Sequence, residues 1–246
     1  MITSVDNPRV KEVLRLRKAR ERRRSGLFVA EGPREVERAL AAGLHSRAVY
    51  VAPELLPDWP HAAEEVSGRV LAKMSYRAEP EGVLAIVGIP ERELPADATL
   101  ILVAVGIEKP GNLGAMARTA DAAGADALLI GDANADPWNP NAIRASTGAV
   151  FTLPILEVTR DDVATLGGNK IAAVLGAATD YSEPDYTQPT VFLVGAEDEG
   201  LDDAWCALAE TQVMIPMKGT AADSLNASAA AAVLLFEAVR QRSATP

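Results

Sequence analysis

The sequence predicts an α/β protein, with a mostly parallel C-terminal sheet covered by helices and a smaller α/β domain before it. Three observations support this fold class. Strand-like and helix-like segments alternate along the chain, and residues 100–105 form the continuous apolar run LILVAV expected of a strand buried on both faces. Glycine-rich turns follow the strands of the second half, and the 48% apolar content of the 246 residues is sufficient for a large core.

The first ninety residues predict a small α/β domain. Val10, Val13 and Leu14 recur at helical spacing and predict an amphipathic helix over roughly residues 7–24. Further elements are expected as strands at 27–30, 47–52 and 83–87 and a helix from Pro33 to near Gly43. Residues 89–98 are charged, contain two prolines and have no apolar period. We therefore place a linker at residues 91–98, between an N-terminal domain (1–90) and a C-terminal domain (99–246).

The second half has a more regular pattern. A helix is expected to follow the strand at 100–105 and to end near Gly124, and further strands are expected at 127–130, 149–153, 171–175, 191–194 and 213–215. The last predicted helix, 225–240, is apolar on nearly every side, which is typical of a helix buried against another element or another subunit. Ligands of such sheets bind beyond the carboxyl ends of the strands, where the glycines of this sequence lie.

The charge of the chain is unevenly distributed. A formal net charge of −10 argues against a nucleic-acid partner, because binding to a phosphate backbone needs a positive surface. Residues 1–24, however, hold nine basic and three acidic residues, a net of +6, whereas residues 94–246 hold 8 basic and 20 acidic ones. The basic segment is either a solvated helix face or an element that contacts phosphates, and charge alone favours neither. The RNA-binding candidates are Arg9, Lys11, Arg15, Lys18, Arg22, Arg23 and Arg24.

Several classes of protein are excluded by composition. The single cysteine, Cys206, rules out an intramolecular disulfide framework and a multi-cysteine metal site, and we predict no metal site at all. No apolar run approaches the roughly 20 residues that span a bilayer, and the N-terminus lacks a signal-peptide core. These features predict a soluble, cytoplasmic protein. His45 and His61 are expected on the surface, and Cys206 is expected to be a packed thiol.

The first of three strand-to-turn junctions contains Gly106, Gly111 and Gly114. Their spacing superficially suggests dinucleotide binding, but it does not match G-x-G-x-x-G, and the chain has no Walker A sequence. On its own, this junction is most simply interpreted as a helix start, with Asn112 as the N-cap and Arg118 as a solvated helix residue.

The second junction places three acidic residues after Gly195 and before Gly200, with Asp202 or Asp203 available to cap a following helix. Carboxylates this close repel each other, so at least one is expected to have a partner such as an arginine. The third junction, Ile215-Pro-Met217, leads to Ser224-Leu-Asn226-Ala-Ser228, where Ser224 or Asn226 could be a simple cap.

Taken together, the three junctions resemble the signature blocks of the SpoU (TrmH-type) family of SPOUT RNA 2′-O-ribose methyltransferases. The blocks of that family are Asn-x-Gly…Arg, Gly-x-Glu-x-x-Gly-Leu and Ile-Pro-Met…Ser-Leu-Asn-x-Ser. Here they read Asn112-Leu-Gly114…Arg118, Gly195-Ala-Glu197-Asp-Glu-Gly200-Leu201 and Ile215-Pro-Met217…Ser224-Leu-Asn226-Ala-Ser228, within about residues 99–240. Lys109 stands where the family usually has Asp, and Ala227 stands where it usually has Val.

The N-terminal resemblance is looser. Residues 1–90, with Phe28-Val-Ala-Glu-Gly-Pro33, are similar to the ribosomal-protein-like RNA-binding domain that precedes the catalytic domain in rRNA-modifying members of the family. The resemblance therefore favours rRNA over tRNA as the substrate, with 23S rRNA as the expected target.

The resemblance implies a deep trefoil knot, a homodimer formed through the C-terminal domain and S-adenosylmethionine as the methyl donor. It implies cofactor binding by Gly195, Glu197, Gly200, Ile215, Met217, Ser224 and Leu225. It implies catalytic roles for Arg118, Asn112, Glu197, Ser224 and Asn226. In this scheme Asn112 holds Arg118 or the ribose, and Glu197 fixes Arg118 or the geometry of the blocks.

Arg118 is the residue that the resemblance implicates in activating the 2′-hydroxyl. A guanidinium is a poor base at neutral pH, so we hypothesise that Arg118 mainly stabilises the developing alkoxide. Methylation at pyrimidine carbon 5 is disfavoured, because it needs a reactive cysteine. Two alternatives stay open: a tRNA 2′-O-ribose methyltransferase, and a catalytically silent RNA-binding protein of ribosome assembly. The intact polar residues of the blocks count against the silent protein.

Overall fold

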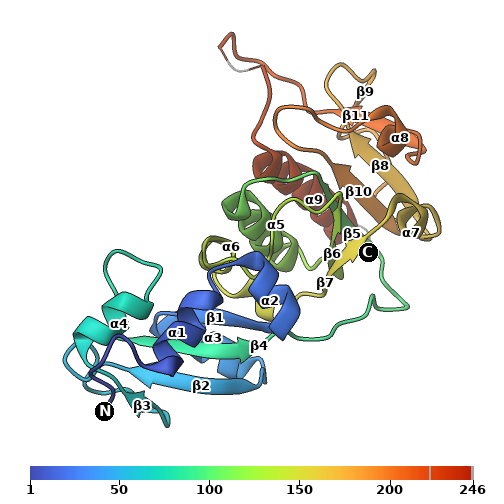
Figure 1. The fold of residues 1–246 in the computed structure, drawn as a ribbon. Coiled ribbons are helices and arrows are strands. Elements are labelled where there is room, and N and C mark those ends of the chain that lie inside the picture. The colour runs from blue at the N-terminus through green and yellow to red at the C-terminus, as the bar shows by residue number, and fades with distance from the viewer. Residues whose placement is uncertain (222, 245–246) are drawn as a thin grey trace. The chain divides into compact units, whose positions relative to one another are not determined.

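A computed structural model describes residues 1–221 and 223–244 of the chain (Figure 1). The chain forms two compact units. Unit 1 comprises Met1–Glu91 together with Trp138–Thr152, and unit 2 comprises Arg92–Pro137 together with the described residues from Leu153 onward. Residues 138–152, which the sequence placed in the C-terminal domain, are thus part of the unit formed by the N-terminal residues.

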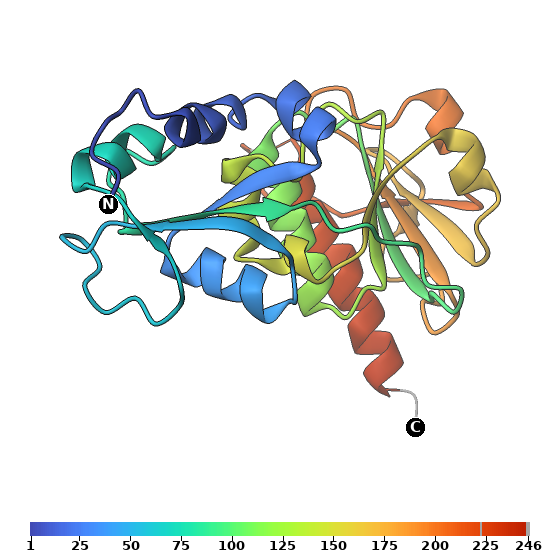
Figure 2. The same cartoon turned by 60° about the horizontal axis from the view of Figure 1, so that its bottom comes forward.

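Unit 1 is built on a four-stranded sheet with the order β1-β4-β2-β3. Its strands are β1 (Leu27–Glu31), β2 (Ser46–Val51), β3 (Glu64–Glu65) and β4 (Val83–Gly88). Strand β4 pairs antiparallel with β1 and β2, and β3 adds in parallel to β2. The helices of residues 1–91 are α1 (Pro8–Arg15), α2 (Ala19–Ser25), α3 (Pro33–Ala41) and α4 (Gly68–Met74). Figure 2 shows α1 and α4 on one face of the sheet and α3 on the other.

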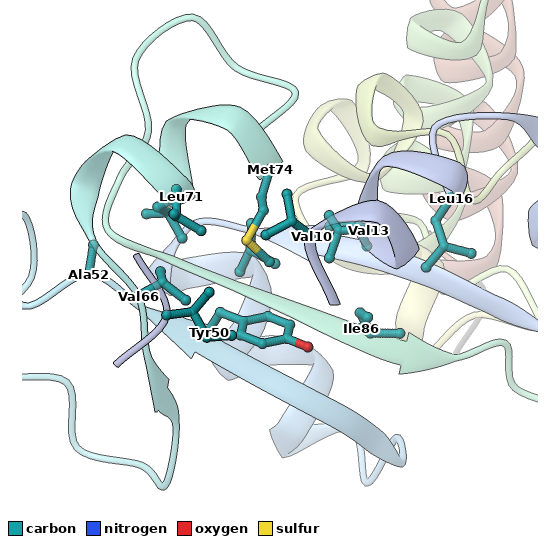
Figure 3. Close-up of a cluster of buried hydrophobic side chains, with 13 residues drawn as sticks. Val10, Val13, Leu16, Tyr50, Ala52, Val66, Leu71, Met74 and Ile86 are labelled. Carbon is teal, nitrogen blue, oxygen red and sulfur yellow. The ribbon is translucent and has the colours of Figure 1, made fainter. Parts of the chain in front are cut away.

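The core of unit 1 lies between α1, α4 and the sheet (Figure 3). Val10 and Val13 of α1 point toward Ile86 of the central strand, and Met74 of α4 completes the layer from the other helix. The apolar spacing that predicted the first helix is therefore the face that α1 buries. Because helices cover both faces of the sheet, five consecutive residues of β4, 83–87, are buried.

The predicted single helix over residues 7–24 is two helices. Helix α1 ends at Arg15, with Leu16 as its C-cap, and α2 begins at Ala19. The guanidinium of Arg22 lies under this break and donates hydrogen bonds to the carbonyl oxygens of Leu16 (2.7 Å) and Arg17 (2.9 Å). These oxygens have no partner further along the helix because the helix stops, so a buried arginine satisfies them.

Residues 138–152 form α6 (Pro140–Ser146) and a short 3₁₀ helix, η1 (Ala149–Phe151). The strand predicted at 149–153 was wrong. Thr147 and Gly148 have φ angles of +52° and +93°, so the chain turns through two left-handed residues that are incompatible with an extended approach. This segment is fixed in unit 1 by aromatic rings: the ring of Phe28 lies 4.9 Å from that of Trp138 and 5.7 Å from that of Phe151.

Unit 2 contains a seven-stranded sheet with the order β7-β6-β5-β10-β8-β11-β9, in which every pairing is parallel. Its strands are β5 (Leu100–Val105), β6 (Ala127–Gly131), β7 (Ile155–Val158), β8 (Asn169–Ala173), β9 (Thr179–Asp180), β10 (Thr190–Val194) and β11 (Thr211–Met214). The mostly parallel sheet predicted from the sequence is confirmed. The trefoil knot stays a prediction.

Helices cover both faces of this sheet. They are α5 (Pro110–Ala122), α7 (Arg160–Ala164), α8 (Asp203–Cys206) and α9 (Ala227–Ala244). Helices α5 and α9 lie side by side against β5 and β10 (Figures 1 and 2). Val163 of α7 and Trp205 of α8 pack in the core on the other face. The last helix is only partly buried, since Leu234 and Leu235 are enclosed whereas Phe236 is 48% exposed.

Candidate active site

A cavity of about 260 Å³ opens at the carboxyl ends of β8, β10 and β11. All the residues predicted to bind the cofactor lie in its wall: Gly195, Glu197, Gly200, Ile215, Met217, Ser224 and Leu225. They come from two segments far apart in the sequence, the loop 195–201 after β10 and the segment 215–225 after β11. The sheet thus brings the second and third junctions together at one ligand-sized site, as expected at the carboxyl edge of a parallel sheet.

The loop 195–201 closes on itself through its two glycines. The N–H of Gly200 donates to the carbonyl oxygen of Ala196 at 2.9 Å, and Gly200 itself has φ +69°. A Cβ on Gly195 would lie 2.2 Å from the carbonyl carbon of Gly200, which no side chain tolerates. Glycine at both positions is therefore what allows this tight turn to form the wall of the cavity.

Glu197 joins all three junctions. Its Oε1 atom accepts a hydrogen bond from Nδ2 of Asn112, in the first turn of α5, and another from Nδ2 of Asn226, at the start of α9, at 3.1 Å. The expectation that one of the three neighbouring carboxylates has a partner is met at Glu197, but by two amides rather than by an arginine. Asp198 and Glu199 remain exposed.

The local structure explains why both asparagines are available. The N-cap of α5 is Lys109, which provides no side-chain cap, so the interpretation of Asn112 as the N-cap was wrong. Asn112 lies within the helix, and its amide is directed to Glu197. Asn226 has two roles: its Oδ1 accepts from the backbone N–H of Ser228 at 2.9 Å, which caps α9, while its Nδ2 donates to Glu197.

Arg118 lies two turns further along α5 and is exposed. Among the described residues it makes no hydrogen bond and no ion pair, so neither Asn112 nor Glu197 holds it in this structure. An unengaged guanidinium can reach a phosphate or a developing oxyanion. Ser224 is likewise exposed and lies in the cavity wall.

Sequence reasoning missed part of the wall. Ala173, Val174 and Leu175 line the cavity from the end of β8, and Leu175 is 68% exposed. The available signal was the predicted strand at 171–175, because the carboxyl end of any strand beside β10 in a parallel sheet borders the same edge.

The RNA-binding candidates differ in exposure and in whether they form ion pairs. Arg22 is 1% exposed and caps α1, so its prediction as an RNA contact was wrong. Arg9 is exposed but pairs with Glu64, and Arg24 pairs with Glu21 at 2.7 Å. The remaining candidates, Lys11, Arg15, Lys18 and Arg23, are exposed.

Metal sites and membrane spans are both absent from residues 1–221 and 223–244. In that part of the chain, no group of three or more His, Cys, Asp or Glu side chains is arranged to hold a metal ion. No helix in the same residues has the length and apolar character to cross a membrane. His45 and His61 are both exposed, as predicted.

Comparison with known proteins identifies the family. Residues 99–236 match the model of the SpoU rRNA methylase family, which is more than half of the chain. The chain belongs to the SpoU methylase family. Residues 7–85 also match the MRM3-like substrate binding domain, so the sequence prediction of this family is confirmed.

Relatives of this SpoU-family chain cover nearly its whole length. The 23S rRNA (guanosine(2553)-2′-O)-methyltransferase RlmP of Bacillus subtilis is 30% identical over 96% of the chain and 97% of its own length. A crystal structure of an RNA 2′-O ribose methyltransferase has a TM-score of 0.85 at 44% identity and covers 98% of this chain and 99% of that one. The SpoU methyltransferase AviRb of Streptomyces viridochromogenes, crystallised with AdoMet, has a TM-score of 0.85 at 30% identity and covers 98% and 100%.

The cavity of this SpoU-family chain suits S-adenosylmethionine. Its volume of about 260 Å³ is near the lower end of small-molecule sites, about 300 Å³. Leu175, Ile215 and Leu225 provide apolar surface for a nucleoside, and the glycine loop lets backbone groups approach a ligand closely. Glu197 lies in the same wall as a carboxylate that can face a positively charged donor.

Proposed function

We propose that this chain is an S-adenosylmethionine-dependent methyltransferase that methylates a ribose 2′-hydroxyl of RNA, with 23S rRNA as its substrate. The observation that supports this proposal most strongly is the position of Glu197, one of whose carboxylate oxygens accepts hydrogen bonds from Asn112 and Asn226 beside the cavity. The name of RlmP, which is 30% identical over 96% of the chain, supports 23S rRNA as the target. The enzyme works in the cytoplasm as a homodimer whose C-terminal domains carry the trefoil knot.

Unit 2 contains the catalytic site, and residues 1–90 bind the RNA. When bound, S-adenosylmethionine supplies an electrophilic methyl group on its sulfonium. The donor is held by the loop 195–201 together with Ile215, Met217, Ser224 and Leu225. Glu197 joins this loop to α5 and to the start of α9. Transfer to an oxygen needs alignment of donor and acceptor and removal of the hydroxyl proton.

Arg118 acts on the acceptor. Its exposed guanidinium binds the phosphate next to the target ribose and stabilises the negative charge that develops on the 2′-oxygen. Because arginine keeps its proton at neutral pH, the proton of the hydroxyl leaves to another acceptor, such as the RNA phosphate or water. The polar groups of Asn112, Ser224 and Asn226 line the path between donor and ribose.

The homodimer is supported by helix α9. This helix is apolar along most of its length, yet Phe236 is 48% exposed in the single chain. An exposed aromatic residue on an apolar helix is typical of a surface that another subunit covers.

Binding and transfer are tested separately. Isothermal titration calorimetry with S-adenosylmethionine tests the donor site, and weaker binding in Glu197→Ala is expected. Mapping of ribose methylation on rRNA from cells with and without this gene tests the reaction, and a 2′-O-methyl group that disappears with the gene is expected.

The outcomes separate the alternatives. A chain that binds no S-adenosylmethionine is the silent RNA-binding protein. A chain that binds the donor but leaves rRNA unchanged, and whose loss removes a ribose methyl group from tRNA, is the tRNA enzyme.

A further inference from the structure

Helix α8 directly follows the cavity loop and has only four residues, Asp203–Cys206. A helix this short is not stable by itself, because it closes too few hydrogen bonds to offset its nucleation cost. Its position, and with it the carboxyl end of the loop 195–201, must therefore be fixed by contacts of its side chains. The strongest of those contacts reach Asp132 and Arg160, which lie outside the three signature blocks.

Trp205 is the anchor of α8. It is 1% exposed and packs against Gly131 at the end of β6, so closely that a Cβ on Gly131 would lie 2.6 Å from two carbons of the indole ring. Its Nε1 donates a hydrogen bond of 2.6 Å to Oδ2 of Asp132. Asp132 has φ +45°, a left-handed conformation that a non-glycine residue adopts at a cost, so the backbone here is constrained to present that carboxylate.

Arg160 completes the cluster from the first position of α7. Its guanidinium carbon lies 5.6 Å from the centre of the Trp205 ring, and its Nη2 lies 3.0 Å from Asp202, the N-cap of α8, and 3.8 Å from Asp132. These charges are about half exposed, so solvent weakens their attraction. The buried indole and its N–H therefore carry most of the anchoring.

From these contacts we infer that Asp132, Trp205 and Arg160 are positioning residues for the donor site, acting through α8 on the loop 195–201. The loop is fixed at three points: β10 holds its start, Glu197 holds its middle, and α8 holds its end at Leu201, which lines the cavity. Releasing α8 leaves the end of the loop free, and a looser wall binds the donor more weakly because ordering it costs conformational entropy. The inference rests on the proposed function only in naming S-adenosylmethionine as the ligand.

The test uses paired variants of the full chain. Trp205→Phe removes the N–H donor and keeps an aromatic ring, and Asp132→Gly removes the acceptor while relieving the positive φ. Asp132→Asn keeps both an acceptor oxygen and a residue that tolerates this conformation. Trp59→Phe is the matched control, because Nε1 of Trp59 is buried without a hydrogen-bond partner.

We expect calorimetry to show a Kd for S-adenosylmethionine raised about three- to tenfold in Trp205→Phe and Asp132→Gly, the upper value corresponding to the loss of one hydrogen bond. Asp132→Asn and Trp59→Phe are expected to stay within about twofold of the native chain. Melting temperatures are measured alongside. A lower melting temperature in Trp205→Phe and Asp132→Gly with an unchanged Kd would mean that the cluster only stabilises the fold, and it would overturn the inference.

Cys206 gives a second readout that needs no donor. It is the single cysteine of the chain, and its Sγ lies 3.7 Å from the carbonyl oxygen of Leu201 at the end of the loop. We expect iodoacetamide to alkylate Cys206 faster in Asp132→Gly than in the native chain or Asp132→Asn. Equal alkylation rates in the three chains would contradict the inference, whether or not the native chain binds S-adenosylmethionine. A native chain that binds no S-adenosylmethionine would instead refute the proposed function.

Discussion

Replacing Glu197 tests whether the three junctions that meet at its carboxylate act as one donor site, as proposed above. Glu197→Gln keeps the size of the side chain and can keep an oxygen at the position of Oε1, which accepts from both Asn112 and Asn226. Only the charge of the acceptor is lost. Glu197→Ala removes the acceptor altogether, so the amides of Asn112 and Asn226 lose the partner that they share at the edge of the cavity.

The two changes differ in expected magnitude. Hydrogen bonds to a charged acceptor contribute about 1.5–3 kcal/mol each and neutral ones about 0.5–1.5 kcal/mol, and partial exposure reduces both values. We therefore expect Glu197→Gln to cost about 1 kcal/mol, or roughly fivefold in the Kd for S-adenosylmethionine. Glu197→Ala should cost about 2–4 kcal/mol, or roughly 30-fold to 1,000-fold.

Calorimetry of donor binding measures both variants, and Asp121→Asn is the matched control. Asp121 is exposed on α5, outside the cavity wall, and its substitution removes the same charge. If Glu197→Ala and Asp121→Asn bound the donor equally well, the three junctions would not act as one site, and the reasoning from geometry would be refuted.

Four further predictions concern other parts of the chain. Arg118→Lys should lower the rate of methyl transfer about 10²- to 10³-fold with donor affinity unchanged, because an ammonium cannot reproduce the planar, two-pronged guanidinium. Single-turnover kinetics measures this rate, and a rate equal to that of the native chain would contradict the role of the guanidinium. Lys11, Arg15 and Lys18 are exposed cations of the N-terminal segment. Replacing them with Gln should weaken RNA binding and reduce the slope of log K against log salt concentration by about 0.7–0.9 for each phosphate that is no longer neutralised. Arg22→Ala should instead lower the melting temperature because its bonds to the end of α1 disappear, and a melting curve identical to the native one would contradict its structural role. Burial and the charges of Asp203 and Asp202 raise the pKa of Cys206 above its ordinary value of 9.0, so its alkylation rate should keep rising beyond pH 9, and a plateau below that pH would be inconsistent.

The sequence predicts regular elements and motif positions well, for identifiable reasons. The run at 100–105 is apolar because both faces of β5 are covered, and the signature blocks lie at strand ends because a parallel sheet collects them at one edge. The pairing of Glu197 with two asparagines was not predictable, since it depends on how α5 and α9 approach the loop. Local charge had favoured an arginine instead.

Two errors have a common physical origin. The run of basic residues concealed that Arg22 points inward, because a cationic side chain is buried only where acceptors such as backbone carbonyls need a donor. The apolar residues at 149–151 looked like a strand, but the left-handed turn at Thr147 and Gly148 directs them into a 3₁₀ helix. In both cases the outcome is decided where regular structure is interrupted, at the end of α1 and at the turn of Thr147 and Gly148. A periodic sequence pattern carries no information about such interruptions.

The two units are not separated by a single domain boundary, because unit 1 contains two separate stretches of the chain. A single linker at 91–98 would make residues 99–246 separable, but the connection between β6 and β7 supplies Trp138–Thr152 to unit 1. The chain therefore passes between the units three times, after Glu91, after Pro137 and after Thr152. Cutting at the linker would deprive Trp138 and Phe151 of the ring of Phe28 on which they stack. The aromatic contact of Phe28 with Trp138 and Phe151 therefore lies within unit 1, and the fold of unit 1 depends on a segment that follows β6 in the sequence.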